Sequence, residues 1–317
     1  MKRYFIAILS VAIFTVACKK SIETIVEPSK QITKTTRSVD PIIRFNNNDY
    51  LISNGMMNFT TFTQYENLFE VLDANNLTEF AYMVEESDAM QSYNEVQSEE
   101  LKQNFIGSIV NDMGLIKIDV YTILLDFNSR IVYATRTGTA QDLLNAKMGN
   151  IASSLLSFSM DANDVIEELI EHKTRGILCN ERWAASKNQW TGVLTTSVIV
   201  PVNVNATLQA NVKYSSSGIY FELQTESYCP QWANIGNTGT VVPRSLYYSY
   251  SWERRCGTSG SGSNTNSCTQ SVGAVNNRCR IVIYGNVRAL KHYSLSATIS
   301  SNRSIPASDS KSVSIAD

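Results

Sequence analysis

The feature that most constrains the fold is a long stretch in which apolar and polar residues alternate one by one. From Val198 to Tyr214 every second residue is apolar, and apart from Ile199 the residues between them are polar or proline. Successive side chains of a β-strand point to opposite faces, so this pattern gives one apolar and one polar face. We therefore expect strand structure here, with Pro201 at an edge or a β-bulge because proline donates no ladder hydrogen bond.

The same alternation recurs toward the carboxyl end, between segments rich in Gly, Ser and Asn. Its apolar positions are Ile219, Phe221 and Leu223, then Leu246, Tyr248, Tyr250 and Trp252, then Ile281, Ile283, Val287 and Ala289, and finally Leu295, Ala297 and Ile299. Five or more antiparallel strands predict a sandwich or an open barrel. The segment Cys256–Gly262 has the glycines of a phosphate loop but no following Lys-Ser/Thr, and it predicts a flexible loop closed by a disulfide.

The first half of the chain has a helical period instead. We expect helices in two pieces between Phe62 and Val96, and then at Glu99–Met113, Gln141–Met148 and Asp164–His172, the last one capped by Asp161 or Asn163. The β-branched runs 115–125 and 131–135 flank Asn128-Ser129 and predict a hairpin. The expected class is α+β, with a mixed helical and β-hairpin region over residues 41–185 and an all-β antiparallel, sandwich-like domain over residues 186–317.

The amino end predicts export. Lys2 and Arg3 precede thirteen uncharged residues, Tyr4–Val16, and Lys19 follows soon after. This length suits the apolar part of a signal peptide, whereas a membrane-spanning helix needs about 20 apolar residues. We therefore expect residues 1–17 to be a cleaved signal peptide and residues 18–40 to be a flexible tether.

The tetrapeptide Thr15-Val16-Ala17-Cys18 resembles the lipobox of bacterial lipoproteins, with Thr15 in place of the usual Leu. The resemblance implies that Cys18 carries lipid, including palmitate, and that the membrane is a partner through this anchor. Two or three acyl chains hold a protein stably on a membrane. The expected location is the cell envelope, at the outer membrane, and its periplasmic and surface faces both stay open.

A second resemblance concerns the segment Phe105–Asp119, which is followed by Thr122–Leu125 and Ile131–Tyr133. It looks like a pattern in a family of uncharacterised envelope lipoproteins of Bacteroidota, in which a helix ends at an Asn-x-x-Gly turn before a strand pair. Asn54–Phe59 is also similar, while Ile118-Asp119-Val120 stands where the family has Ile-Gly-Asp. The resemblance implies a location and no activity.

Five cysteines remain once Cys18 is set aside: Cys179, Cys229, Cys256, Cys268 and Cys279. An exported protein meets an oxidising compartment, which favours disulfides. Because Cys256, Cys268 and Cys279 are closely spaced, we expect two of them to form a bridge and Cys179 to pair with Cys229, although spacing does not determine connectivity. No metal is expected, since short C-x₂₋₄-C spacing is missing and the chain has only two histidines.

Charge is distributed unevenly along the chain. The segment from Asp40 to Arg175 has 8 Lys/Arg and 21 Asp/Glu, a balance of −13, and the segment from Thr240 to Asp317 has 9 and 3, a balance of +6. We expect the two halves to dock on each other through these charges. Nucleic acid is not an expected partner of an envelope protein.

The sequence shows no catalytic motif. Its acidic clusters Glu85-Glu86, Glu99-Glu100 and Glu167-Glu168 with Glu171 lie on helical patterns, where carboxylates usually form the solvated face. His172 and His292 are in no recognisable triad context, and a G-x-S-x-G elbow is missing. We expect no enzymatic activity and no cofactor, with an envelope hydrolase as a second alternative.

Aromatic residues collect in the β-rich half, and flat rings are what sugar and peptide sites use. Tyr248, Tyr250 and Trp252 fall on the core side of their strand, so Tyr247 is expected on the opposite, exposed side. The candidate ligand-binding residues are Tyr247, Trp232 and Tyr228. The expected function is a non-enzymatic binding or assembly module whose partner is an envelope protein or a glycan, with a glycan-binding, adhesin-like surface protein as the first alternative.

Overall fold

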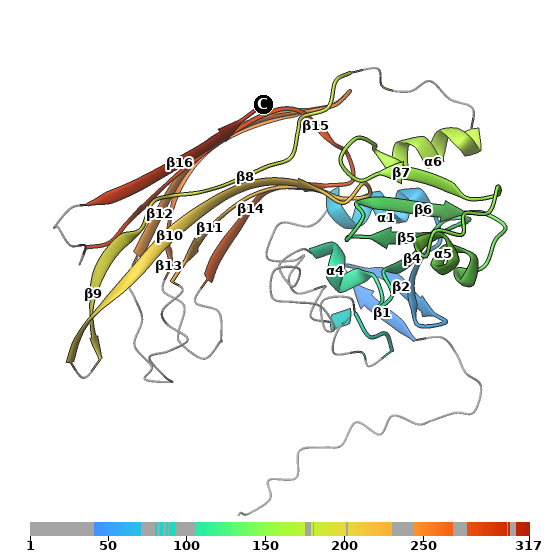
Figure 1. The fold of residues 1–317 in the computed structure, drawn as a ribbon, viewed down its shortest axis with the longest axis horizontal. Helices are drawn as coiled ribbons and strands as arrows, with labels where there is room; N and C mark the ends of the chain where they lie inside the picture. Colours follow the sequence, from blue (N-terminus) through green and yellow to red (C-terminus); the bar gives the residue numbers. More distant parts are fainter. Residues whose placement is uncertain are drawn as a thin grey trace, which may run out of the picture. The chain divides into compact units, whose positions relative to one another are not determined.

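Figure 1 shows the computed structural model of the chain, in which Asp40–Asp317 is one compact unit. It describes residues 41–70, 80, 83–84, 87, 89–92, 105–174, 179, 181–200, 202–229, 244–268, 278–302, 304 and 309–317. The expected signal peptide, tether and Cys18 lie outside these residues. Within them, no helix is both long and apolar enough to cross a membrane.

The first part contains a seven-stranded sheet whose strands follow chain order. These are β1 (Ile42–Phe45), β2 (Asn48–Ser53), β3 (Met56–Phe59), β4 (Leu115–Ile118), β5 (Tyr121–Asp126), β6 (Ile131–Thr135) and β7 (Leu156–Ser159). All neighbours are antiparallel except β3 and β4, which are parallel. The helices that accompany it are α1 (Phe62–Glu70), α4 (Phe105–Ile109), α5 (Ala140–Lys147) and α6 (Val165–Thr174).

The expected hairpin across Asn128-Ser129 is confirmed by the pairing of β5 with β6. The run 115–125, however, is two strands rather than one. The chain reverses after Ile118, where Asp119 has φ of 56° and its N–H donates to the carbonyl of Phe59 at 2.8 Å. Asp is among the few residues that tolerate this left-handed conformation, and hydrophobic alternation alone gives no sign of such a turn.

Two helix predictions need correction. The helix expected at Glu99–Met113 is described only from Phe105 and ends at Ile109, because the Asn111 side chain accepts hydrogen bonds from the N–H groups of Met113 and Leu115 and shapes a turn. The helix expected at Asp164–His172 is present as α6. Its cap is Asp164 itself, whose carboxylate accepts from the N–H of Glu167 at 3.2 Å, and not Asp161 or Asn163.

The second part consists of two further antiparallel sheets. One contains β8 (Lys187–Trp190), β9 (Leu194–Val200), β10 (Val202–Ser216), β11 (Phe221–Tyr228) and β14 (Arg278–Asn286). The other has the order β13-β12-β15-β16, with β12 (Arg244–Arg254), β13 (Ser259–Cys268), β15 (Leu290–Ser300) and β16 (Ser310–Ala316). The described chain is therefore rich in antiparallel β-structure, as expected.

The alternating run that predicts a strand is divided between β9 and β10. These two strands pair with each other, with Val200 opposite Val202, so the chain reverses inside the run. Pro201 lies outside the described residues, and so does the edge or bulge expected there. The alternation gives no sign of the reversal, because the paired residues Val200 and Val202 are two positions apart and the turn therefore keeps the period of two.

The segment Cys256–Gly262 is expected to be a flexible loop, but its residues from Ser259 onward belong to the ten-residue strand β13, which pairs with β12 over its whole length. The glycines of this strand have a steric reason. A Cβ on Gly260 would lie 2.6 Å from the ring of Trp252, and one on Gly262 would lie 2.9 Å from the hydroxyl oxygen of Tyr250. Glycine is needed at these positions because the cross-strand rings occupy the space of a side chain.

One hydrophobic core is shared by the two sheets of the second part. Leu208, Val212 and Leu223 come from one sheet, and Leu246, Leu295 and Ile299 come from the other, all of them fully buried. A separate core underlies the seven-stranded sheet, and it also takes in Ile219, Tyr220 and Val287. The buried Tyr65 on α1 donates a hydrogen bond to the carbonyl of Ile219 at 3.0 Å. Buried contacts therefore join the α/β region to the β-rich region.

Candidate functional site

Tyr247 lies on the exposed side of β12, as the alternation predicts. Its side is opposite to that of Tyr248, which is only 9% exposed, whereas Tyr247 is 46% exposed. Tyr250 and Trp252 pack against the shared core. The three core-side rings are therefore structural, and Tyr247 is the aromatic residue that β12 offers to solvent.

The neighbours of Tyr247 form a grid of small hydroxyl side chains. Its row reads Thr265, Tyr247, Thr298 and Ser312 across four strands, the next reads Ser263, Ser249, Ser296 and Ser314, and the third reads Ser261, Ser251, Ser294 and Ala316. Ten of these twelve residues are Ser or Thr, and none is charged. We call these twelve residues the hydroxyl face.

Hydroxyl groups on the hydroxyl face bond to one another across the strands. Ser249 and Ser296 lie 3.0 Å apart through their Oγ atoms, Ser251 and Ser294 lie 2.9 Å apart, and Thr298 Oγ1 lies 2.8 Å from the Oγ of Ser312. Each hydroxyl can donate one hydrogen bond and accept two. A pair bonded to each other thus keeps further capacity for a ligand.

The second candidate, Tyr228 at the end of β11, packs against a tryptophan of another strand. Its ring centroid lies 6.2 Å from that of Trp190 on β8, in an edge-to-face arrangement, and Trp190 is 42% exposed. The same strand is charged farther toward its start, because Glu222 forms an ion pair with Arg280, which also donates to Gln224. The third candidate, Trp232, lies outside the described residues.

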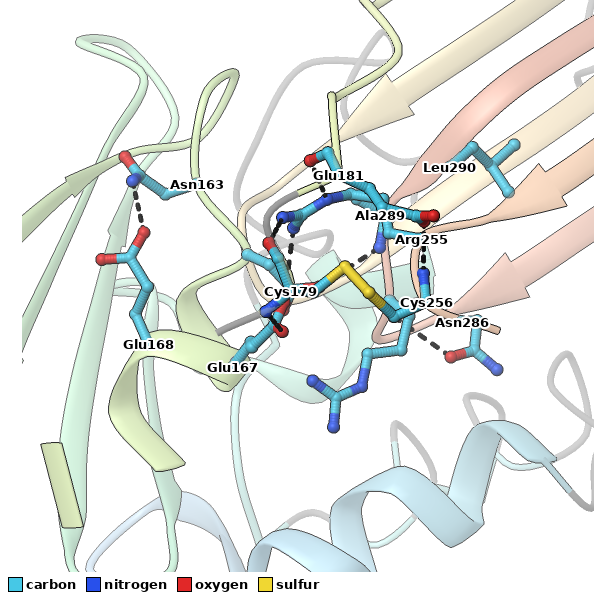
Figure 2. A network of polar contacts seen from close by, with 12 residues as sticks. Asn163, Glu167, Glu168, Cys179, Glu181, Arg255, Cys256, Asn286, Ala289 and Leu290 are labelled. Carbon is cyan, nitrogen blue, oxygen red and sulfur yellow. Dashed lines mark hydrogen bonds and ion pairs between the residues drawn. A yellow bond between two sulfur atoms is a disulfide. The ribbon is translucent and has the colours of Figure 1, made fainter. Parts of the chain in front are cut away.

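A polar network surrounds the disulfide between Cys179 and Cys256, which bridges 77 residues (Figure 2). The expected pair Cys179–Cys229 is therefore wrong. Cys229 is buried, remains a thiol, and follows Tyr228 at the end of β11 that pairs with Arg278. Cys179 instead contacts Glu167 on α6 and Arg255 and Cys256 after β12, and a sulfur already bonded to Cys256 forms no second disulfide.

The other cysteines are only partly described. Cys279 is disulfide-bonded as well, and the side chain of Cys268 lies outside the described residues. The Sγ atoms of Cys179 and Cys256 and a carboxylate oxygen of Glu181 lie within 4.8 Å of one another. These are metal-ligand types, but sulfurs bonded to each other are not the thiolates that bind zinc.

Arg255 is the centre of the network. Its guanidinium donates to the carbonyls of Cys179 and Glu181 and pairs with Glu167 at 3.3 Å, and its side chain is 5% exposed. It also stacks on Trp183, with 3.9 Å from Cζ to the ring centroid. A guanidinium removed from water needs such complete satisfaction to be tolerated. The sequence gives no sign of this role except that Arg255 adjoins a cysteine.

Among the residues that the structure describes, two ion pairs join the acidic half of the chain to the basic half. Glu66 on α1 lies 2.6 Å from the guanidinium of Arg288, and Glu167 on α6 pairs with Arg255. This agrees with the docking expected from the opposite charges of the two segments. Both arginines belong to turns that follow strands of the β-rich region, so the charge asymmetry is used within the molecule.

Asp164 lies at the start of α6 and is fully buried. Burial raises the pKa of its carboxyl to about 7, against the opposing effect of the nearby Arg288. One carboxyl oxygen accepts from the N–H of Glu167, and the other accepts from the N–H of Ala289 at 3.3 Å. Asp164 thus caps α6 and holds it to the turn between β14 and β15.

Two cavities adjoin this network. One, of about 270 Å³, is lined by the polar and charged residues Asn163, Asp164, Glu167, Glu168, Glu181 and Arg255 together with Trp183. Within it Asn163 donates to the Glu168 carboxylate (Figure 2). The other, of about 320 Å³, has the charged lining Glu66, Glu167, Arg254, Arg255 and Arg288, and we call it the arginine cavity.

The remaining candidates from the sequence are dispersed. His292 on β15 lies 3.1 Å through Nδ1 from a guanidinium nitrogen of Arg182, and the side chain of His172 lies outside the described residues. The clusters Glu85-Glu86 and Glu99-Glu100 lie outside them too. Glu167 and Glu168 line the smaller cavity together. Trp190 is an exposed aromatic residue that the sequence did not single out. All four residues of its strand β8 are exposed, so the strand shows no alternation of apolar and polar residues from which the exposed side could be predicted.

Comparisons of the chain with protein-family models, with curated proteins and with solved structures gave no match.

Proposed function

We propose that this protein is a lipid-anchored envelope protein that binds a neutral glycan through the hydroxyl face around Tyr247. The observation that carries the proposal is the exposed ring of Tyr247 inside an uncharged grid of Ser and Thr side chains. Sugars present apolar C–H faces and hydroxyl groups, and this surface offers a matching ring and matching hydroxyls.

The rigidity of the grid supports the proposal. Short side chains on a paired sheet lose little rotamer freedom when a ligand binds, so the entropic cost of recognition is small. The lack of charge favours an uncharged ligand, because a charged one would lose hydration without gaining a partner. A sandwich-like arrangement of the two carboxyl-terminal sheets, suggested by their shared core, would present the hydroxyl face outward.

The location rests on the sequence alone. The apolar stretch Tyr4–Val16 and the lipobox-like Thr15–Cys18 support export and lipid attachment, and the resemblance to Bacteroidota envelope lipoproteins agrees with them. A Cys18→Ser variant should leave the membrane fraction. Protease treatment of intact cells then distinguishes the surface from the periplasmic face of the outer membrane.

The binding test is a glycan array probed with the full-length chain in a polyoxyethylene detergent, since sugar-based detergents would compete. We expect binding to uncharged oligosaccharides and at least tenfold weaker binding by Tyr247→Ala. The matched control is Trp190→Ala, which removes an aromatic ring of similar exposure from the other sheet. Its binding should stay unchanged.

Each other outcome has a clear meaning. Loss of binding by Trp190→Ala with Tyr247→Ala intact would move the glycan site to the Trp190–Tyr228 pair. A chain that ignores the array but co-purifies with one envelope protein would instead favour the assembly role.

A hydrolase is the second candidate, because Glu167 and Glu168 line one cavity and Asp164, beside them, has a raised pKa. Glycosidases need two carboxyl groups about 5–10 Å apart, one of them a proton donor. Both oxygens of Asp164 already accept backbone hydrogen bonds, which favours a structural role. Hydrolysis of an array glycan by the wild type, abolished by Glu168→Gln, would support the enzyme.

A further inference from the structure

The hydroxyl face is part of a longer uncharged surface on the same sheet. On the other side of the Tyr247 row, a fourth row reads Ser267, Ser245, Ser300 and Ser310. Within it Ser245 and Ser300 are half-buried and Ser310 is exposed. The four rows contain fourteen Ser and Thr residues, one Tyr and one Ala, and Tyr247 has a row of serines on either side. We call these sixteen residues the neutral surface.

The neutral surface is longer along the strands than across them. Consecutive rows are two residues apart, or about 7 Å, and neighbouring strands are about 4.8 Å apart. Four rows therefore extend for about 20 Å along the strands, and four strands extend for about 14 Å across. Beyond the row of Ser251 the neutral surface ends, because the next row contains Glu253 and His292. The Glu253 carboxylate is paired with Lys291.

We propose that the neutral surface binds an extended, uncharged polysaccharide chain that lies along the strands. This inference rests on the proposed function and names the class of its ligand. The long dimension of the surface is several times the width of a sugar ring. A chain laid along β12 and β15 contacts the ring of Tyr247 and, two rows farther on, the hydroxyl groups of Ser251 and Ser294.

The openness of the sheet favours a chain over a single sugar. Sites for small ligands are concave and bury most of the ligand. A sugar stacked on Tyr247 is covered from one side only, because Thr265 and Ser312 in the same row are exposed, as Tyr247 is. One sugar unit should therefore bind weakly. Units linked to a bound one lose little further translational freedom, so their contacts add to the affinity.

Bonded hydroxyl pairs supply contacts at a distance from the ring. The Oγ atoms of Ser249 and Ser296 lie 3.0 Å apart, and those of Ser251 and Ser294 lie 2.9 Å apart, so each pair joins β12 to β15. A sugar hydroxyl both donates and accepts hydrogen bonds, and it can bind such a pair in either role. Because the pairs repeat from row to row, they suit a ligand whose hydroxyl groups also repeat.

The test is calorimetric titration of the full-length chain in a polyoxyethylene detergent. The probes are malto-, cello- and manno-oligosaccharides of one to six units, together with each uncharged oligosaccharide bound on the array and its one- and two-unit fragments. In at least one series we expect the affinity to rise about tenfold or more from two units to the longest chain. Tyr247→Ala should weaken the binding of short and long chains alike.

A double variant, Ser251→Ala with Ser294→Ala, examines the far end of the neutral surface. These residues lie about 14 Å along the strands from Tyr247, beyond the reach of one sugar unit stacked on its ring. The double variant should weaken binding of the longest chain about threefold and reduce the gain in affinity from added units. The matched control is Ser157→Ala, an exposed serine on β7 of the seven-stranded sheet, which should change nothing.

The other outcomes separate this inference from the proposed function. Equal affinity for one unit and for the longest chain would overturn the polysaccharide ligand and leave glycan binding standing. A gain with length that the double variant keeps in full would overturn the placement along the strands. Binding of none of these probes, together with an array that shows no uncharged ligand, would remove the proposed function itself.

Discussion

The hydroxyl face and the arginine cavity are both polar, but they differ in charge, regularity and burial. The hydroxyl face has ten Ser and Thr side chains and no charge, and its members lie on four paired strands. The arginine cavity has five charged side chains from two helices, a strand end and two turns, and its ion pairs Glu66–Arg288 and Glu167–Arg255 are partly buried. One surface is neutral, regular and exposed, and the other is charged, irregular and partly buried.

The two surfaces therefore differ in what they contribute to the fold. Exposed hydroxyl groups exchange their hydrogen bonds with water at little cost in free energy. The hydroxyl face therefore contributes little to the stability of the fold and is available for recognition. A buried guanidinium or carboxylate must keep every partner, so the polar network beside the cavity is coupled to folding. Substitutions in the two regions should separate recognition from stability.

The largest effect is expected for Arg255→Ala. It removes the cation paired with Glu167, the donor to two carbonyls and the stacking on Trp183, and it leaves the N–H of Cys179 as the described donor to the Glu167 carboxylate. The free energy of unfolding should fall by about 3–5 kcal/mol in chemical denaturation. The control is Arg44→Ala, whose pair with Asp49 is solvent-exposed and should cost about 0–1 kcal/mol. Equal losses in both variants would contradict the difference between buried and exposed charge.

The next effect concerns pH and Asp164. Its carboxyl has a pKa of about 7 in the folded chain and about 3.9 when unfolded. Between these values the folded state holds a proton that the unfolded state has lost, so the contribution of Asp164 to stability is highest below about pH 4 and falls as the pH rises to 7. The loss is at most about 4 kcal/mol, at 1.36 kcal/mol per pKa unit.

Asp164→Asn should remove that decline. The amide oxygen still caps α6 through the N–H of Glu167, although the bond from Ala289 is lost and costs about 1 kcal/mol at every pH. Urea denaturation at several values from pH 4 to 8 provides the measurement, with the wild-type curve subtracted. Parallel curves for the two proteins would show that Asp164 does not titrate in this range.

A smaller loss is expected in β13, on the core side of the hydroxyl-bearing sheet. Gly260→Val places a branched side chain where a Cβ already lies 2.6 Å from the Trp252 ring. Thermal denaturation should show a loss of about 1–3 kcal/mol. Ser261→Val on the same strand points outward and should change stability by about 0.5 kcal/mol or less. A Gly260→Val protein as stable as Ser261→Val would mean that the ring can move aside.

The smallest stability effect belongs to the hydroxyl face itself. Ser249→Ala removes the hydroxyl contact with Ser296 and should change the unfolding free energy by about 0.5 kcal/mol or less. On the glycan array its binding should nevertheless weaken. A loss of stability above 1.5 kcal/mol with unchanged binding would make these hydroxyls structural and remove the contrast between the two regions.

The elements set by local pattern were predictable from sequence. Alternation gave the exposed side of Tyr247 and the core side of Tyr248, and the helical period gave α5 and α6. Turns within a run were not predictable, because the reversals at Asp119 and between Val200 and Val202 leave the alternation intact. The strand β13 was missed because glycine usually weakens strands. Its glycines are explained only by the aromatic rings of β12 that lie opposite them.

The polar network could not be predicted from any local sequence pattern. Arg255, Glu167 and Cys179 are 12 to 88 residues apart, and nothing in a window around any one of them predicts the others. The wrong Cys179–Cys229 pairing has the same origin, since connectivity depends on which turns meet in space. What the sequence did indicate was the opposite charge of the two halves, and the Glu66–Arg288 and Glu167–Arg255 pairs use that charge.

The disulfide implies that the turns beside the arginine cavity are covalently joined only late in biogenesis. Cys179 and Cys256 are separated by 77 residues, and Arg254, Arg255 and Glu181 lie within two residues of one or the other. Until the carboxyl-terminal strands have left the ribosome and met an oxidant, the two turns that carry these residues are not covalently joined. Disulfides persist in envelope compartments and are reduced in the cytosol. A chain kept in a reducing compartment would therefore lack the covalent closure of this site.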